Sequence, residues 1–160
     1  MVTQAETLQF LNAQIARAEV YFGIISGQLL FEENRPGCAI TFGREDQFQG
    51  MVQVTKTLRD PDPQKKKQYR TLSSEKPVRT IHRGHSSSWQ SRDPSIGFYG
   101  GGFYLAPHMI GISGLVERDD DAFAAIVMLK LGVGDVTHWH AQMEISGNRD
   151  RFDKFMALWK

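Results

Sequence analysis

The stretch that decides the fold reads IGISGLVERDDDAFA and covers residues 110–124. A short apolar run is followed by a stop at Ser113-Gly114, by the acidic triplet 119–121, and then by a helical pattern. Acidic side chains in the first turn of a helix suit the positive end of its dipole. The segment therefore predicts a strand, a tight turn and the beginning of a helix.

Length and composition predict a single globular domain over residues 1–160. Hydrophobic residues make up 41% of the chain, and the formal net charge of +1 gives no general electrostatic case for a nucleic-acid or membrane partner. Cys38 is the one cysteine, which excludes an intramolecular disulfide and a cysteine metal cluster. The sequence shows no secretory pattern and no apolar run long enough to cross a bilayer, so we expect a soluble, cytoplasmic protein.

The N-terminal residues predict a helix over 3–19. Thr3 and Glu6 have the spacing of a capping box. Apolar residues on one face of that helix are Leu8, Leu11, Ile15 and Ala18. The β-rich stretch 20–31 then predicts strand structure with a bend or hairpin at Gly27.

A turn at 34–37 precedes an expected short strand over 38–42. Residues 44–59 are predicted to form a second helix, because apolar residues recur at helical spacing. These residues are Phe48, Met51, Val52 and Thr55.

The next stretch is polar and basic. Prolines at 61 and 63 end the preceding helix, and three consecutive lysines follow at 65–67. We interpret residues of about 60–77 as a mobile basic loop, followed by a short strand over 78–82. A second polar loop is expected over 85–94.

The C-terminal half shows clearer patterns. The runs 98–105 and 109–113 predict two strands joined by a turn, and 120–131 predicts a helix that ends at a glycine pair. Residues 135–146 fit a strand and a helix equally. Residues 148–159 predict a closing helix.

The expected order is thus helix, two strands, helix, two or three strands, helix, and a C-terminal helical extension. Strands joined by short turns favour an antiparallel sheet covered by helices, which is an α+β fold.

Three features of the chain resemble the closing region of the GlcG/haem-binding family. These are the pair Gly101-Gly102, the strand end at 110–114, and Asp120-Asp121-Ala122 after a five-residue spacer. The resemblance implies a profilin-like antiparallel sheet and a tendency to form homo-oligomers. It implies no settled enzymatic activity; some members bind haem, which leaves haem open as a cofactor here.

The leading functional hypothesis is a small-molecule site between the sheet and its loops. The residues expected to line it are Trp89, Tyr99, Gly101, Gly102, Tyr104, His108 and Ser113. The glycines would allow close approach of a ligand or of a partner subunit. His108 could ligate haem iron together with Met109, or be a solvated turn residue. Ser113 would turn the chain and cap the following helix.

A second hypothesis is an enzyme with a histidine-bound divalent metal. His82 and His85 form one closely spaced pair, and His138 and His140 form another. Imidazoles at such spacings can converge on a transition metal. On a strand, His138 and His140 would project from the same face. The alternative is that these are two unrelated surface pairs.

A third hypothesis is an interaction module that binds nucleic acid through the basic region 60–92. Its lysines and arginines could follow a phosphate backbone, with Tyr69 or Trp89 stacking on bases. The near-zero net charge argues against nucleic-acid binding. It favours a solvated loop whose positive charge is balanced by acidic residues elsewhere.

Overall fold

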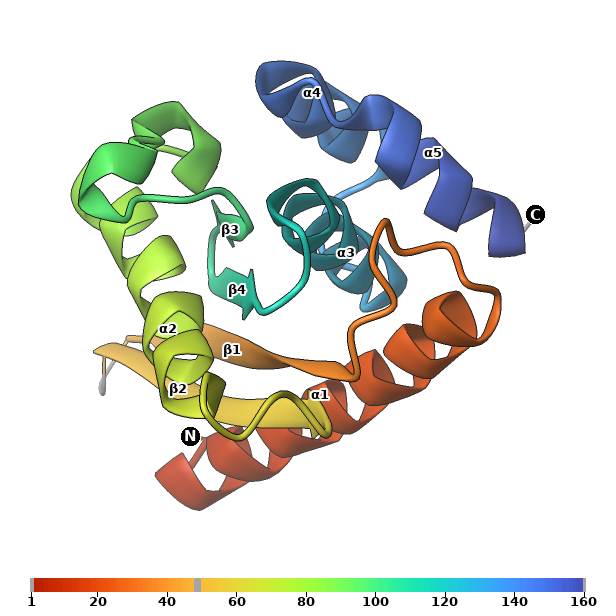
Figure 1. The fold of residues 1–160 in the computed structure, drawn as a ribbon. Helices are drawn as coiled ribbons and strands as arrows, with labels where there is room; N and C mark the ends of the chain where they lie inside the picture. Colours follow the sequence, from red (N-terminus) through yellow and green to blue (C-terminus); the bar gives the residue numbers. More distant parts are fainter. Residues whose placement is uncertain (1, 48–49, 160) are drawn as a thin grey trace.

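The computed structural model describes residues 2–47 and 50–159, and its centre is a four-stranded antiparallel sheet in the order β2-β1-β4-β3 (Figure 1). The strands are β1 (Gly37–Asp46), β2 (Gly50–Arg59), β3 (Gly102–Leu105) and β4 (His108–Ser113). β1 lies between β2 and β4, so that Thr41 stands opposite Thr55 on one side and Gly111 on the other. β2 and β3 form the two edges.

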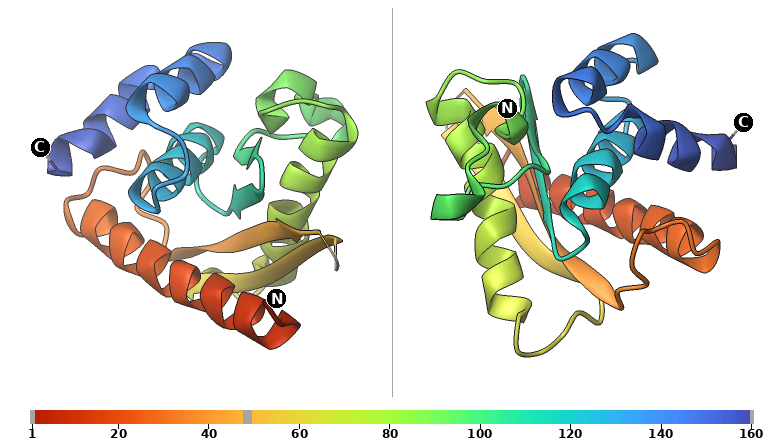
Figure 2. Two further views of the ribbon diagram at one scale, coloured as in Figure 1. Left: turned by 180° about the vertical axis from the view of Figure 1, so that it is seen from behind. Right: turned by 45° about the horizontal axis from the view of Figure 1, so that its top comes forward.

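Helices cover both faces of the sheet. The α-helices are α1 (Gln4–Gly27), α2 (Lys66–His82), α3 (Glu117–Lys130), α4 (Val136–Ser146) and α5 (Arg149–Met156), and short 3-10 turns are η1 (Ser88–Ser91), η2 (Pro94–Ile96) and η3 (Ala157–Trp159). α2 packs on one face; α1 and α3 pack on the other, with α4 and α5 outside α3 (Figures 1 and 2). The predicted α+β class and element order are therefore confirmed.

The largest part of the core lies between the sheet and the α1–α3 layer. α3 is buried on almost every side, including every residue from Asp119 to Met128, as expected for a helix enclosed by other elements. The rings of Phe22 and Phe31 lie 5.2 Å apart, and both contact Phe123. This aromatic cluster joins α1 to α3.

The predicted strand structure over 20–31 is wrong, because α1 continues to Gly27. The Thr3–Glu6 capping box begins the helix as expected. Beyond residue 19, Phe22 and Ile25 continue the buried stripe at helical spacing. Burial of that stripe overrides the β-propensity of the local sequence.

The predicted helix over 44–59 is also wrong. β1 extends to Asp46, and β2 occupies Gly50–Arg59. In β2, Val52 and Leu58 are buried on the face that packs against α1. Alternate Thr and Val residues are typical of a strand, and this period outweighs the helical spacing. Phe48, part of the expected helical stripe, lies outside the described residues.

The basic stretch predicted as a mobile loop, and the short strand expected at 78–82, both belong to α2. The buried face of α2 consists of Ser73, Lys76, Pro77, Arg79 and Thr80. These residues have helical spacing, but only Pro77 among them is apolar. A search for apolar periodicity therefore misses the helix.

The C-terminal predictions agree better with the structure. The two strands expected within 98–113 are β3 and β4, and the expected helices near 120–131 and 148–159 are α3 and α5. Residues 135–146, which fitted either structure, form the helix α4, with Asp135 as its N-cap. The central motif is thus a strand, a turn and a helix, as predicted.

Candidate functional site

Glycines allow α2 to contact the sheet backbone directly. A Cβ atom on Gly102 would lie 2.6 Å from Cβ of Lys76, and one on Gly111 would overlap the main-chain oxygen of Ser73. Gly101 has a φ of +105°, and a Cβ there would lie 3.2 Å from Lys76 Nζ. The close approach at Gly102 is therefore made by Lys76 of α2, and that at Gly101 by Asp120 of α3, Ile112 O and Lys76 Nζ.

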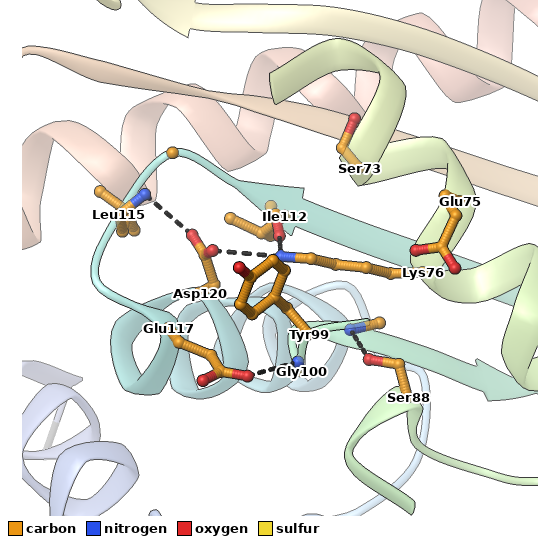
Figure 3. A network of polar contacts seen from close by, with 12 residues as sticks. Ser73, Glu75, Lys76, Ser88, Tyr99, Gly100, Ile112, Leu115, Glu117 and Asp120 are labelled. Atoms are coloured by element: carbon orange, nitrogen blue, oxygen red, sulfur yellow. Dashed lines mark hydrogen bonds and ion pairs between the residues drawn. The ribbon is translucent and has the colours of Figure 1, made fainter. Parts of the chain in front are cut away.

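A buried ion pair joins α2 to the beginning of α3 (Figure 3). Lys76 Nζ donates to Ile112 O at 2.6 Å and to Asp120 Oδ2 at 3.1 Å. Oδ1 of Asp120 accepts from the Leu115 amide at 2.9 Å. Burial raises the pKa of Asp120 to about 7, although Lys76 opposes the shift. The pair fixes α2, β4 and α3 relative to one another.

The neighbouring acidic residues are buried as well. Asp119 accepts from Arg151 and from the Glu32 amide, and Asp121 accepts from Asn148. Burial raises the pKa of both carboxyls, that of Asp121 to about 6. The acidic triplet therefore links α3 to its neighbours, a role that the helix-dipole argument did not predict.

The segment between α2 and β3 is held by hydrogen bonds from both flanking helices. Arg79 Nη2 donates to Tyr99 O at 2.6 Å, and the Glu117 carboxylate accepts from the Gly100 amide at 2.8 Å. Ser88 Oγ accepts from the Gly102 amide at 2.9 Å (Figure 3). These bonds set the position of the polar loop beside β3.

A pocket of about 430 Å³ opens where this loop meets the β3–β4 turn and the end of α2. We call it the β3 pocket. Its lining residues are Ile81, Gly84, His85, Ser86, Gln90, Tyr104, Leu105 and Ala106. Its volume falls within the range of about 300–1,000 Å³ that is usual for small-molecule sites.

The β3 pocket combines an apolar wall with a polar one. Ile81, Leu105 and Ala106 supply aliphatic surface. His85 is among the polar lining residues, and its Nδ1 is buried and has no hydrogen-bonding partner among the described residues. The Tyr104 hydroxyl donates to Glu45 Oε2 at 2.9 Å. Desolvation and this hydrogen bond raise the pKa of Tyr104, which keeps its hydroxyl protonated.

Of the residues predicted to bind the ligand, Tyr104 lines the β3 pocket. His85, which also lines this pocket, was predicted as a metal ligand instead. Trp89 instead packs on Gly100 and lies 5.1 Å from the Arg92 guanidinium. Tyr99 is partly buried, and its main-chain oxygen is bound by Arg79.

The other two predicted ligand residues lie on β4. Ser113 is buried and does not cap α3, whose N-cap is Val116. His108 lies near Phe42, and burial together with Arg44 lowers its pKa. Successive strand residues point to opposite faces, and Met109 is fully buried. The predicted His108–Met109 pair therefore cannot ligate one haem iron.

The four predicted metal-binding histidines do not converge. Within residues 2–47 and 50–159, no group of three or more His, Cys, Asp or Glu side chains has the geometry of a metal site. His138 and His140 lie on a helix rather than a strand, where residues two apart do not share a face. His140 Nε2 instead lies 3.2 Å from Asp153.

Sequence reasoning missed most of the pocket wall. Ile81 and Gly84 lie at and beyond the end of α2, a helix that the sequence did not predict. The backbone hydrogen bond from Tyr104 N to Ser86 O places the polar loop beside Tyr104. No family model, curated protein or solved structure matches the chain. No described helix is long and apolar enough to span a membrane.

Proposed function

We propose that this protein binds a small organic molecule in the β3 pocket. The observation that carries the proposal is a pocket of about 430 Å³ with an aliphatic wall, lined also by His85, whose buried Nδ1 has no hydrogen-bonding partner among the described residues. A buried polar atom without a partner costs about 1–3 kcal/mol. A ligand that pairs with Nδ1, after the imidazole has turned this nitrogen toward the pocket, would recover much of that cost.

The lining indicates the chemistry of the ligand. Ile81 and Leu105 suit an apolar, flat body, and His85 suits a single hydrogen-bonding group at one end. The Tyr104 ring adds an aromatic surface. The proposal assigns no catalytic step, and the family resemblance and any role for haem stay predictions.

The proposal includes a homo-oligomer, as the family resemblance implies, and a cytoplasmic location, as the sequence predicts. Val20 and Ile24 lie one turn apart on α1 and are 60% and 39% exposed. Ala13 and Ala16 are exposed on the same helix. Exposed apolar residues grouped in this way support a contact between subunits. Sedimentation equilibrium of the wild type and of Val20→Glu tests it: the variant should be monomeric, and a monomeric wild type would refute the contact.

Ligand binding can be tested with flat aromatic and heteroaromatic compounds screened by saturation-transfer NMR. Ala106→Trp places an indole on the pocket wall and should abolish the binding of any hit. Ala157→Trp places the same indole at an exposed position on η3 that does not line the β3 pocket, and it should leave binding unchanged. If no compound binds, or if hits bind Ala106→Trp as well as the wild type, the β3 pocket is not the ligand site.

A further inference from the structure

The two edges of the sheet differ in how they are covered. The β3 edge is bridged by the preceding loop, because Phe103 pairs with Ser87 and Tyr104 N donates to Ser86 O at 3.0 Å. β2 pairs with β1 on one side only. Among the described residues, no backbone hydrogen bond is made from the other side of Gly50–Arg59. A ten-residue strand therefore presents an open row of amides and carbonyls.

A basic groove runs beside this open edge. It has a volume of about 510 Å³ and lies between β2 and the first turns of α2. Its lining residues are Thr55, Pro63, Lys66, Lys67, Arg70 and Thr71. None of the three cations forms an ion pair with a described residue, and the first turn of α2 has no acidic residue. The groove thus has an uncompensated positive charge.

We propose that an acidic peptide segment in extended conformation binds this β2 groove by adding a strand to β2. An added strand would satisfy the open amides and carbonyls of β2. Alternate side chains of the peptide would then point toward Lys66, Lys67 and Arg70, which favours glutamate or aspartate there. The backbone supplies the affinity, and the groove supplies the preference for acidic residues.

Charge argues against pairing with a second copy of the chain at this edge. β2 contains Lys56 and Arg59 and no acidic residue. Two β2 strands side by side would bring like charges together, which is destabilising. Single-stranded nucleic acids usually bind by stacking bases on aromatic side chains, and no aromatic residue lines the groove. An acidic peptide fits both the charge and the hydrogen-bonding edge.

The test uses an eight-residue fluorescent peptide in which glutamate and valine alternate, with fluorescence anisotropy as the readout. Two further peptides are N-methylated, one at every glutamate and the other at every valine. An added antiparallel strand uses the amides of alternate residues only. One methylation pattern should therefore abolish binding. The other should keep the affinity within about twofold of the parent peptide, because it modifies only the amides that point away from β2.

Charge variants complete the test. The double variant Lys67→Glu, Arg70→Glu should weaken peptide binding about tenfold, because two attractive contacts become repulsive. Acidic residues early in a helix favour the helix, so this change should not unfold α2. Lys154→Glu, an exposed position on α5, is the control and should leave the affinity unchanged.

Four results would overturn the proposal. They are the absence of saturable binding at low salt, equal effects of the two methylation patterns, wild-type affinity in the double variant, and displacement of the peptide by a single-stranded oligonucleotide at lower concentration than by unlabelled peptide. The last result would assign the β2 groove to nucleic acid.

Discussion

Replacement of Lys76 by methionine tests how the buried ion pair holds the fold. Lys76 is 1% exposed, and its ammonium group makes two hydrogen bonds, to Ile112 O and Asp120 Oδ2. Lys76→Met removes both and leaves a buried carboxylate without its cation. Breaking a buried pair from one side costs about 3–5 kcal/mol. That is a large fraction of the total stability of about 5–15 kcal/mol that is usual for a domain.

Two comparisons separate the charge effect from the loss of packing. The double variant Lys76→Met, Asp120→Asn leaves no charge at the site, and an amide oxygen can still accept from Leu115. It should be more stable than Lys76→Met by about 2 kcal/mol or more. The cost of Lys76→Met should also be smaller at pH 5 than at pH 8, because Lys76 lowers the Asp120 pKa, which is about 7 in its presence; without Lys76 the pKa rises further and the carboxyl is protonated at pH 5.

Urea denaturation followed by circular dichroism measures these free energies of unfolding. A cost for Lys76→Met below about 1 kcal/mol would refute the reasoning, because an exposed surface pair is worth about that much. An equal cost at the two pH values would refute it as well.

Three further predictions concern the same framework. Gly111→Ala should lower the free energy of unfolding by about 3 kcal/mol or more in urea denaturation, because the new Cβ would overlap Ser73 O; a change within error would contradict the close packing of α2. In the wild type, the free energy of unfolding should fall as pH rises from about 4 to about 7, because the raised pKa values of Asp120 and Asp121 make the folded state bind more protons than the unfolded state; a rise over that range would contradict it. His85→Phe removes an unpartnered buried nitrogen, so thermal unfolding should show unchanged or higher stability while ligand affinity falls about tenfold; a loss of stability would make His85 a structural residue.

Apolar patterns predicted part of the fold, but in the stretches 20–31 and 44–59 local β-propensity and helical spacing indicated the wrong element. The strand, turn and helix around residues 110–124 follow from local composition, and α3 and α5 have apolar stripes at helical spacing. α2 lacked that signal. It packs on Gly102 through Lys76 and on Gly111 through Ser73, so the α2 residues at this contact are polar rather than large and apolar.

Only single residues of the candidate site were predictable, because the sequence pattern did not reveal α2. Tyr104 and His85 were singled out as functional residues, but for different sites, because their proximity depends on where α2 ends. The four-histidine metal site rested on treating His138 and His140 as strand residues. The open edge of β2 could not be inferred while 44–59 was read as a helix.

The measurement that tests the central claim most directly is a search for intermolecular nuclear Overhauser effects between a screened compound and isotope-labelled protein. Binding in the β3 pocket predicts contacts from the ligand to protons of Ile81, Tyr104 and Leu105, and a shift of the His85 imidazole nitrogen resonances. Contacts confined to other parts of the surface, with the His85 resonances unmoved, would contradict the proposed function.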